Sequence, residues 1–109
     1  MRPYDKRKLI KIAKEFSAGV LDGKPSTDMC FAVSYVLGGY LKFMGYVVDM
    51  QQAFIDCSDA EIEHWYLILP DGLILDCTAS QFNEKLNKKM PMVYIGKKPS
   101  WYRLPEEQN

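Results

Sequence analysis

Three residue types used in covalent catalysis occur in this chain: the only histidine, His64, one of three cysteines, Cys30, and a carboxylate, Asp76. A cysteine thiol becomes a nucleophile when an imidazole takes its proton. A carboxylate bonded to the other ring nitrogen fixes the tautomer and stabilises the imidazolium. In the order Cys, His, Asp, these residues would supply a nucleophile, a base and an orienting group, provided that the fold brings them together.

The helix that would carry Cys30 is predicted over residues 29–45, a stretch that is apolar almost all the way round. A helix of this kind belongs in the interior of a fold. It follows a polar run, residues 24–28, in which three side chains can cap it: Ser26, Thr27 or Asp28. Cys30 in its first turn has two interpretations. It is a small core residue, or its thiolate is favoured by the positive end of the helix dipole.

The loop Pro70-Asp71-Gly72 decides whether His64 and Asp76 share a face of the predicted hairpin. A two-residue loop would put the two side chains on opposite faces, and would place the proline at a ladder position where it has no N–H. A three-residue loop pairs Leu69 with Leu73 and puts His64 and Asp76 on one face. Proline, aspartate and glycine suit successive positions of a type I turn closed by a left-handed residue, so we predict the three-residue loop.

This register divides the hairpin into two faces. One face is expected to hold His64, Tyr66, Ile68, Ile74, Asp76 and Thr78. The other is expected to hold Trp65, Leu67, Leu69, Leu73, Leu75 and Cys77. We expect the central helix to pack across the histidine face with its N-terminus at the His64 end, so that Cys30 reaches the imidazole.

The remaining elements complete an α+β pattern, with helices first and strands after. A further helix is predicted over residues 4–19, and strands over 46–54, 64–69, 73–78 and 92–95. Residues 55–63 are interpreted as an irregular acidic loop and 79–89 as a short polar helix. Trp101 and Tyr102 are expected to pack back on the sheet, and residues 104–109 to form a flexible tail. We therefore predict one domain over 1–109, with a central buried helix against a small antiparallel sheet.

Composition argues against several classes of function. The 109 residues include 14 basic and 14 acidic side chains, so the chain lacks the positive charge of a nucleic-acid or anionic-membrane binder. It has no apolar run of the roughly 18 residues needed to span a bilayer, and its first residues lack the apolar segment of a signal peptide. Three cysteines without paired spacing fit a reducing compartment, so we expect a cytoplasmic protein. Its oligomeric state stays open.

The residues around the three candidates resemble the papain-like fold in its transglutaminase-like form. The resemblance runs from about residue 27 to 82 and is carried by Cys30 at a helix start, His64-Trp65 at a strand start, and Asp76-Cys77-Thr78 on the next strand. It implies that Cys30 is the nucleophile, His64 the general base and acid, and Asp76 the orienting group. It also implies thioester chemistry on a peptide or protein amide, as in cysteine peptidases, amidases, acyltransferases and glutamine deamidases, with no metal or organic cofactor.

The sequence departs from the pattern of this family near the nucleophile. No Trp or Gly flanks Cys30, no Gln lies just upstream of it, and Trp65 follows the histidine directly. The oxyanion would rely on the backbone N–H of Cys30 and on a second donor. Candidates for that donor are Gln51, Gln52 or a side chain of residues 24–28.

Two other interpretations stay open. In the first, the domain is a catalytically silent interaction module, in which His64 bonds structurally to Asp76 beside an inert Cys30. In the second, it binds zinc through one histidine and three cysteines, a common tetrahedral ligand set. The ligands would be Cys30, Cys57, His64 and Cys77. No two of these have the short spacing of structural zinc sites, and the predicted register turns Cys77 away from His64.

Overall fold

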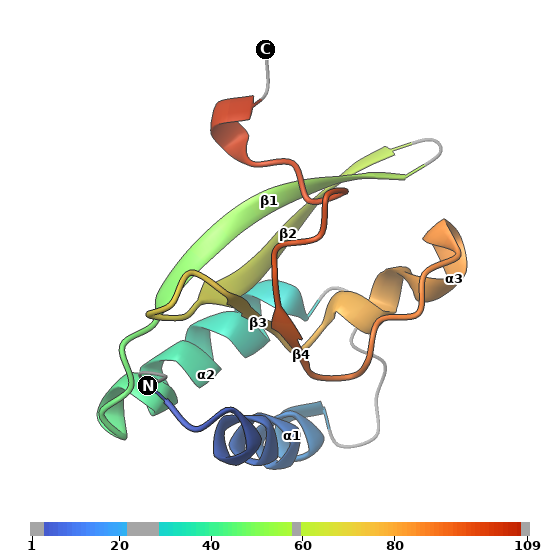
Figure 1. Cartoon of the computed structure of the whole chain (residues 1–109). Coiled ribbons are helices and arrows are strands. Elements are labelled where there is room, and N and C mark those ends of the chain that lie inside the picture. Colours follow the sequence, from blue (N-terminus) through green and yellow to red (C-terminus); the bar gives the residue numbers. More distant parts are fainter. Residues whose placement is uncertain (1–3, 22–28, 58–59, 108–109) are drawn as a thin grey trace.

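The computed structural model describes residues 4–21, 29–57 and 60–107, and shows an α+β domain (Figure 1). Its helices are α1 (Lys6–Leu21), α2 (Cys30–Phe43) and α3 (Asn83–Leu86), with 3₁₀ turns η1 (Ala79–Phe82) and η2 (Pro105–Glu107). Its strands are β1 (Asp49–Cys57), β2 (Ala60–Ile68), β3 (Ile74–Asp76) and β4 (Tyr94–Gly96). They form one antiparallel sheet in the order β1-β2-β3-β4, which confirms the α+β class.

The sheet separates two apolar clusters. Helices α1 and α2 cover one face (Figure 1), where the buried residues include Leu9, Ala13, Val33, Leu37, Leu41, Leu67, Leu69 and Leu75. The other face is covered by η1 and by the chain segment after β4, with Ala53, Ile55, Tyr66, Ile74, Phe82 and Tyr102 buried there. None of the helices in the described segments is both long and apolar enough to cross a membrane.

The predicted register of the β2–β3 hairpin is confirmed. The Leu69 amide donates to the Leu73 carbonyl at 2.8 Å, and Leu67 lies opposite Leu75. Gly72 has a φ of 86°, the left-handed conformation that the three-residue loop requires. The two predicted faces therefore exist, and His64 and Asp76 share one of them.

The expectation that the central helix packs on the histidine face is wrong. Helix α2 buries Val33, Leu37 and Leu41 against the opposite, leucine-rich face. Its backbone comes so close there that a Cβ added to Gly38 would lie 3.1 Å from Leu67 Cδ2. The physical reason is polarity. The histidine face carries buried side chains that need hydrogen-bond partners, and the apolar side chains of α2 offer none.

Helix α2 is also less buried than its composition predicts. Its outer side exposes large apolar side chains, among them Tyr35 with 65% and Phe43 with 89% of its surface accessible. Among the described elements, α2 packs chiefly against β2, β1 and α1. The N-cap is Met29, which provides no capping side chain, and the three residues predicted as caps lie outside the described residues.

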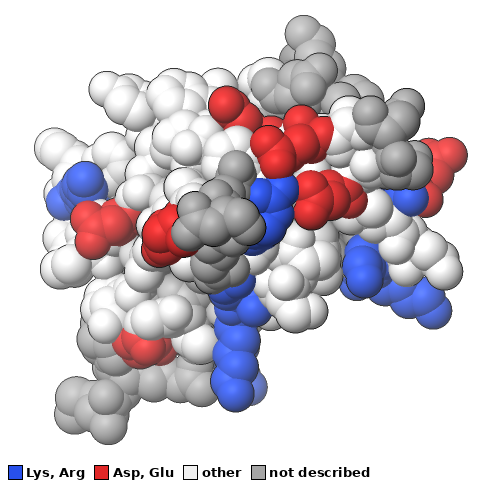
Figure 2. All heavy atoms as spheres, turned by 90° about the horizontal axis from the view of Figure 1, so that it is seen from above, with Lys and Arg blue, Asp and Glu red and all other residues white. Residues whose placement is uncertain are grey.

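Strands β1 and β2 form a longer hairpin than predicted, so the assignment of residues 55–63 as an irregular loop is wrong over the described part. Ile55 lies opposite Ile62 and Cys57 opposite Ala60. Ile55 is fully buried, whereas Asp56 and Glu61 are exposed, and these acidic side chains hide the period-2 pattern. Figure 2 looks down on this end of the molecule and shows acidic and basic side chains side by side.

The segment after β4 packs back on the sheet, as predicted for Trp101 and Tyr102. Tyr102 is fully buried, and the next residue, Arg103, exchanges two backbone hydrogen bonds with Phe54 at 2.7 and 3.0 Å. The Arg103 guanidinium also pairs with Asp56 and Glu61, and hydrogen bonding to Arg103 lowers the pKa of Asp56. Of the segment predicted as a flexible tail, residues 105–107 form η2, and residues 108–109 lie outside the described chain.

Candidate functional site

His64 and Asp76 meet on the sheet face away from the helices. His64 is on β2 and Asp76 at the end of β3, with Nε2 of the imidazole 2.5 Å from Oδ2 of the carboxylate. Neither side chain has any surface accessible to solvent. Two of the three candidate residues are thus in direct contact, in the register that the Pro70-Asp71-Gly72 loop sets.

The Asp76 carboxylate is held by further donors. The Tyr102 hydroxyl donates to Oδ2 at 2.6 Å, while the Thr78 amide and hydroxyl donate to Oδ1 at 2.9 and 3.4 Å. Hydrogen bonds to a buried charged group are among the stronger ones in proteins, so this set holds the Asp76 carboxylate firmly in place. Burial and the contact with Asp76 raise the pKa of Tyr102, which therefore stays a protonated donor.

Tyr102 is the member of this site that the sequence did not reveal. It lies 26 residues from Asp76, so no local spacing links the two. One signal was available, because a buried tyrosine hydroxyl needs a polar partner and only one face of the sheet was expected to offer one. Tyr102 also contacts His64 edge to face, with 5.2 Å between ring centroids.

Apolar rings fix the orientation of the His64 imidazole. Phe82 of η1 contacts it edge to face at a centroid distance of 5.0 Å, on the same sheet face as Tyr66 and Tyr102. These rings keep water from the imidazole, and burial alone would lower the pKa of His64. Hydrogen bonding to Asp76 and to Cys30 outweighs that effect and raises the pKa from 6.5 to about 9. At neutral pH the His64 side chain is therefore an imidazolium.

Cys30 is the first residue of α2 and lies beside the edge of β2. Its thiol is 3.8 Å from the Glu63 carbonyl oxygen, and one turn later the Ser34 hydroxyl donates to the Trp65 carbonyl at 3.0 Å. The Leu69 amide donates to the Leu73 carbonyl, so the backbone groups of Leu69 point toward β3. Because backbone directions repeat every second residue, the carbonyls of Glu63 and Trp65 point to the same side of β2. The β2–β3 pairing extends no further than Leu67, so the edge beside Cys30 is left for the helix.

Cys30, which contacts this edge of β2, also affects the pKa of His64. Asp76 occupies Nε2 of the imidazole, and the other ring nitrogen, Nδ1, is buried and makes no hydrogen bond within the described residues. The Cys30 thiol nevertheless contributes to the raised pKa of His64. The start of helix α2 therefore lies beside the edge of β2, next to the Glu63 carbonyl, and not across the histidine face.

The other two cysteines lie apart from this arrangement. Cys77 is buried on the helix-covered face, where burial raises its pKa to about 12. Cys57 lies at the end of β1, partly buried. Within residues 4–21, 29–57 and 60–107, no three His, Cys, Asp or Glu side chains are grouped so that they could hold a metal ion. The set proposed for zinc is therefore not assembled in one place.

The predicted second oxyanion donors are not brought to Cys30. Gln51 and Gln52 lie on β1, which borders the opposite edge of β2, and the Gln51 amide bonds to the Gln52 carbonyl at 2.8 Å. Residues 24–28 lie outside the described chain. The first backbone bond of α2 runs from Val33 to Met29, which leaves the amides before Val33 without partners inside the helix. Such amides form an anion-binding position.

The His64–Asp76 pair predicts a pH-dependent stability. Because folding raises the pKa of His64 from 6.5 to about 9, the ion pair stabilises the fold fully below about pH 6.5. That contribution is lost as the pH rises through about 9. We expect the free energy of unfolding in urea to fall between these two values, and His64→Phe to remove this dependence. The signals of the single histidine in NMR spectra report the pKa directly. A midpoint near 6.5 would contradict the ion pair.

Comparisons of the chain with protein-family models, with curated proteins and with solved structures found no match. The function of this chain is therefore inferred from the geometry of Cys30, His64 and Asp76 alone.

Proposed function

We propose that this domain is a cysteine-dependent amide hydrolase or acyltransferase that works through a thioester on Cys30. The observation that carries the proposal is the buried pair in which Asp76 takes one nitrogen of His64, while the Cys30 thiol at a helix N-terminus contacts the carbonyl of the preceding residue, Glu63. The partner is a peptide or protein amide. No step needs a metal or an organic cofactor.

The chemistry follows from the position of each group. Asp76 holds Nε2 of His64, so the proton that the Cys30 thiol loses resides on Nδ1, and the reacting state is a thiolate beside an imidazolium. The thiolate attacks the amide carbonyl and forms a C–S bond, while the first amides of α2 stabilise the oxyanion. His64 then gives the proton to the leaving nitrogen as the C–N bond breaks. Water, or an acceptor amine, loses a proton to His64 and displaces Cys30 from the thioester.

The order and placement of the three residues support the papain-like fold in its transglutaminase-like form. The nucleophile begins a helix, the histidine lies on a strand, and the aspartate on the next antiparallel strand. Tyr102 would be an addition to that triad, as a residue that positions Asp76.

The reactivity of Cys30 toward iodoacetamide tests the proposal without a known substrate. An imidazolium beside a thiol favours the thiolate, which is the form that reacts. We expect Cys30 to be alkylated at pH 6.5 at least about tenfold faster than Cys57, and His64→Ala to remove that advantage. Peptide mapping by mass spectrometry after timed labelling measures both rates in one sample, so Cys57 is an internal control.

One observation favours a second candidate, the silent interaction module. His64 has no accessible surface, whereas a general acid must reach the leaving nitrogen of a substrate. If Cys30 and Cys57 label at similar rates, and His64→Ala changes neither, the pair is structural and the silent module is the better description.

A further inference from the structure

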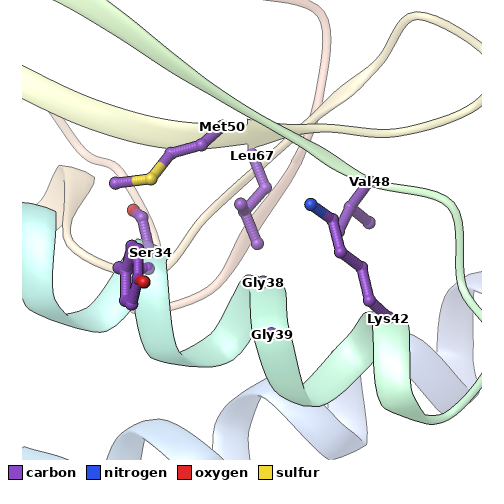
Figure 3. Close-up of a pocket in the computed structure, with 8 residues that line it drawn as sticks. Ser34, Gly38, Gly39, Lys42, Val48, Met50 and Leu67 are labelled. Atoms are coloured by element: carbon purple, nitrogen blue, oxygen red, sulfur yellow. The ribbon is translucent and has the colours of Figure 1, made fainter.

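A groove separate from the His64 pair lies between α2 and β1. It holds a cavity of about 310 Å³ (Figure 3). Leu67, Val48 and Met50 form its apolar strand side, and Tyr35, Gly39 and Lys42 its helix side. Ligand pockets commonly range from about 300 to 1,000 Å³, so this one suits a side chain or two and not a large cofactor.

Strand β1, which borders the groove, is the edge of the sheet. Phe54 exchanges both of its backbone hydrogen bonds with Arg103, so its N–H and C=O point away from β2. Because backbone directions repeat every second residue, those of Gln52 and Met50 also point outward. No strand in the described chain lies beside them, although the Gln51 side chain bonds to the Gln52 carbonyl. The edge therefore offers main-chain donors and acceptors to an added strand.

Lys42 gives the groove its charge. Its amine extends from α2 toward the strand side of the cavity (Figure 3), and it makes no ion pair within the described residues. The nearest acidic residue of β1, Asp49, has the side-chain parity of Ala53 and so lies on the other sheet face. A partner here would meet a cation, an apolar floor and a free strand edge.

We propose that this groove binds an extended peptide segment, which adds a strand to the outer edge of β1. One apolar side chain of the peptide enters the cavity, and a carboxylate pairs with Lys42. The carboxylate is either an acidic side chain or a C-terminus. The site lies at the opposite edge of β2 from Cys30, so it goes beyond the proposed chemistry and does not depend on it.

Two pairs of variants isolate the groove. Gly39 lines the cavity and a Cβ there meets nothing within 4 Å, so Gly39→Leu adds bulk to the groove from an open position and improves helix propensity. Gly19→Leu is the matched control, because Gly19 on α1 is equally open. Lys42→Glu reverses the charge of the groove, and Lys11→Glu is its control on the exposed side of α1.

The probes are synthetic peptides of alternating Thr and Leu, acetylated at the N-terminus. One ends in Glu with an amidated terminus, one in a free carboxylate after Leu, and one is uncharged. Titration into the ¹⁵N-labelled full chain is expected to shift the amide signals of Met50 and Gln52. Gly39→Leu should weaken binding at least about tenfold and Lys42→Glu about fivefold, with both controls unchanged. The stronger of the two charged peptides identifies the source of the carboxylate.

Three results would overturn the proposal. The first is no saturable binding of any probe. The second is binding that Gly39→Leu leaves intact. The third is a concentration-dependent dimer of the free chain whose contacts include the Met50 amide, since the groove would then hold a second copy.

Discussion

Cys30→Ala is expected to abolish acyl transfer while the fold stays intact. The substitution removes the atom that forms the thioester, and loss of a catalytic nucleophile costs about 10⁴-fold or more in kcat. The fold should survive because Cys30 is partly exposed and its contact with the Glu63 carbonyl is long, at 3.8 Å. Release of nitrophenolate from para-nitrophenyl acetate, followed by amide substrates, measures the activity.

The matched control for this variant is Cys57→Ala, which removes another partly buried thiol, at the end of β1. It should keep the activity of the parent. Full activity in Cys30→Ala, or an equal loss in both variants, would rule out Cys30 as the nucleophile.

Asp76→Ala is expected to have the largest effect on stability. It leaves His64 and Tyr102 without the acceptor that both use, in a site closed to water. Removing one partner of a buried ion pair typically costs about 3–5 kcal/mol. The total free energy of unfolding of a natural domain is about 5–15 kcal/mol, so the variant should lose a large part of its stability. Urea unfolding followed by circular dichroism measures the change.

Asp49→Ala serves as the control, because Asp49 is an exposed carboxylate on β1. Asp49→Ala should change the free energy of unfolding by no more than about 0.5 kcal/mol. If Asp76→Ala were as mild, the pair would contribute nothing to the fold, and Asp76 could not be holding His64 in place.

The parts of the site that depend on local rules could be predicted from the sequence. The Pro70-Asp71-Gly72 loop fixes a register by its own turn chemistry, and that register puts His64 and Asp76 on one face. Turn geometry involves only neighbouring residues, so no knowledge of the rest of the fold was needed.

The parts that depend on tertiary packing could not be predicted. The apolar residues of α2 surround the helix, so its sequence did not show which face the sheet would take. Tyr102 reaches Asp76 from a distant segment that the hairpin rules do not place. The acidic side chains of residues 56–61 hid a strand pattern that the buried Ile55 and its partner Ile62 carry.

Detection of an acyl-enzyme on Cys30 tests the central claim most directly. The full-length protein is mixed with para-nitrophenyl acetate at neutral pH, quenched with acid, and analysed by intact mass and by peptide mapping. We predict one added acetyl group on Cys30, released by hydroxylamine, absent in Cys30→Ala and much reduced in His64→Ala. Acetylation spread over lysines or on Cys57, with Cys30 unmodified, would contradict a thioester mechanism at this site.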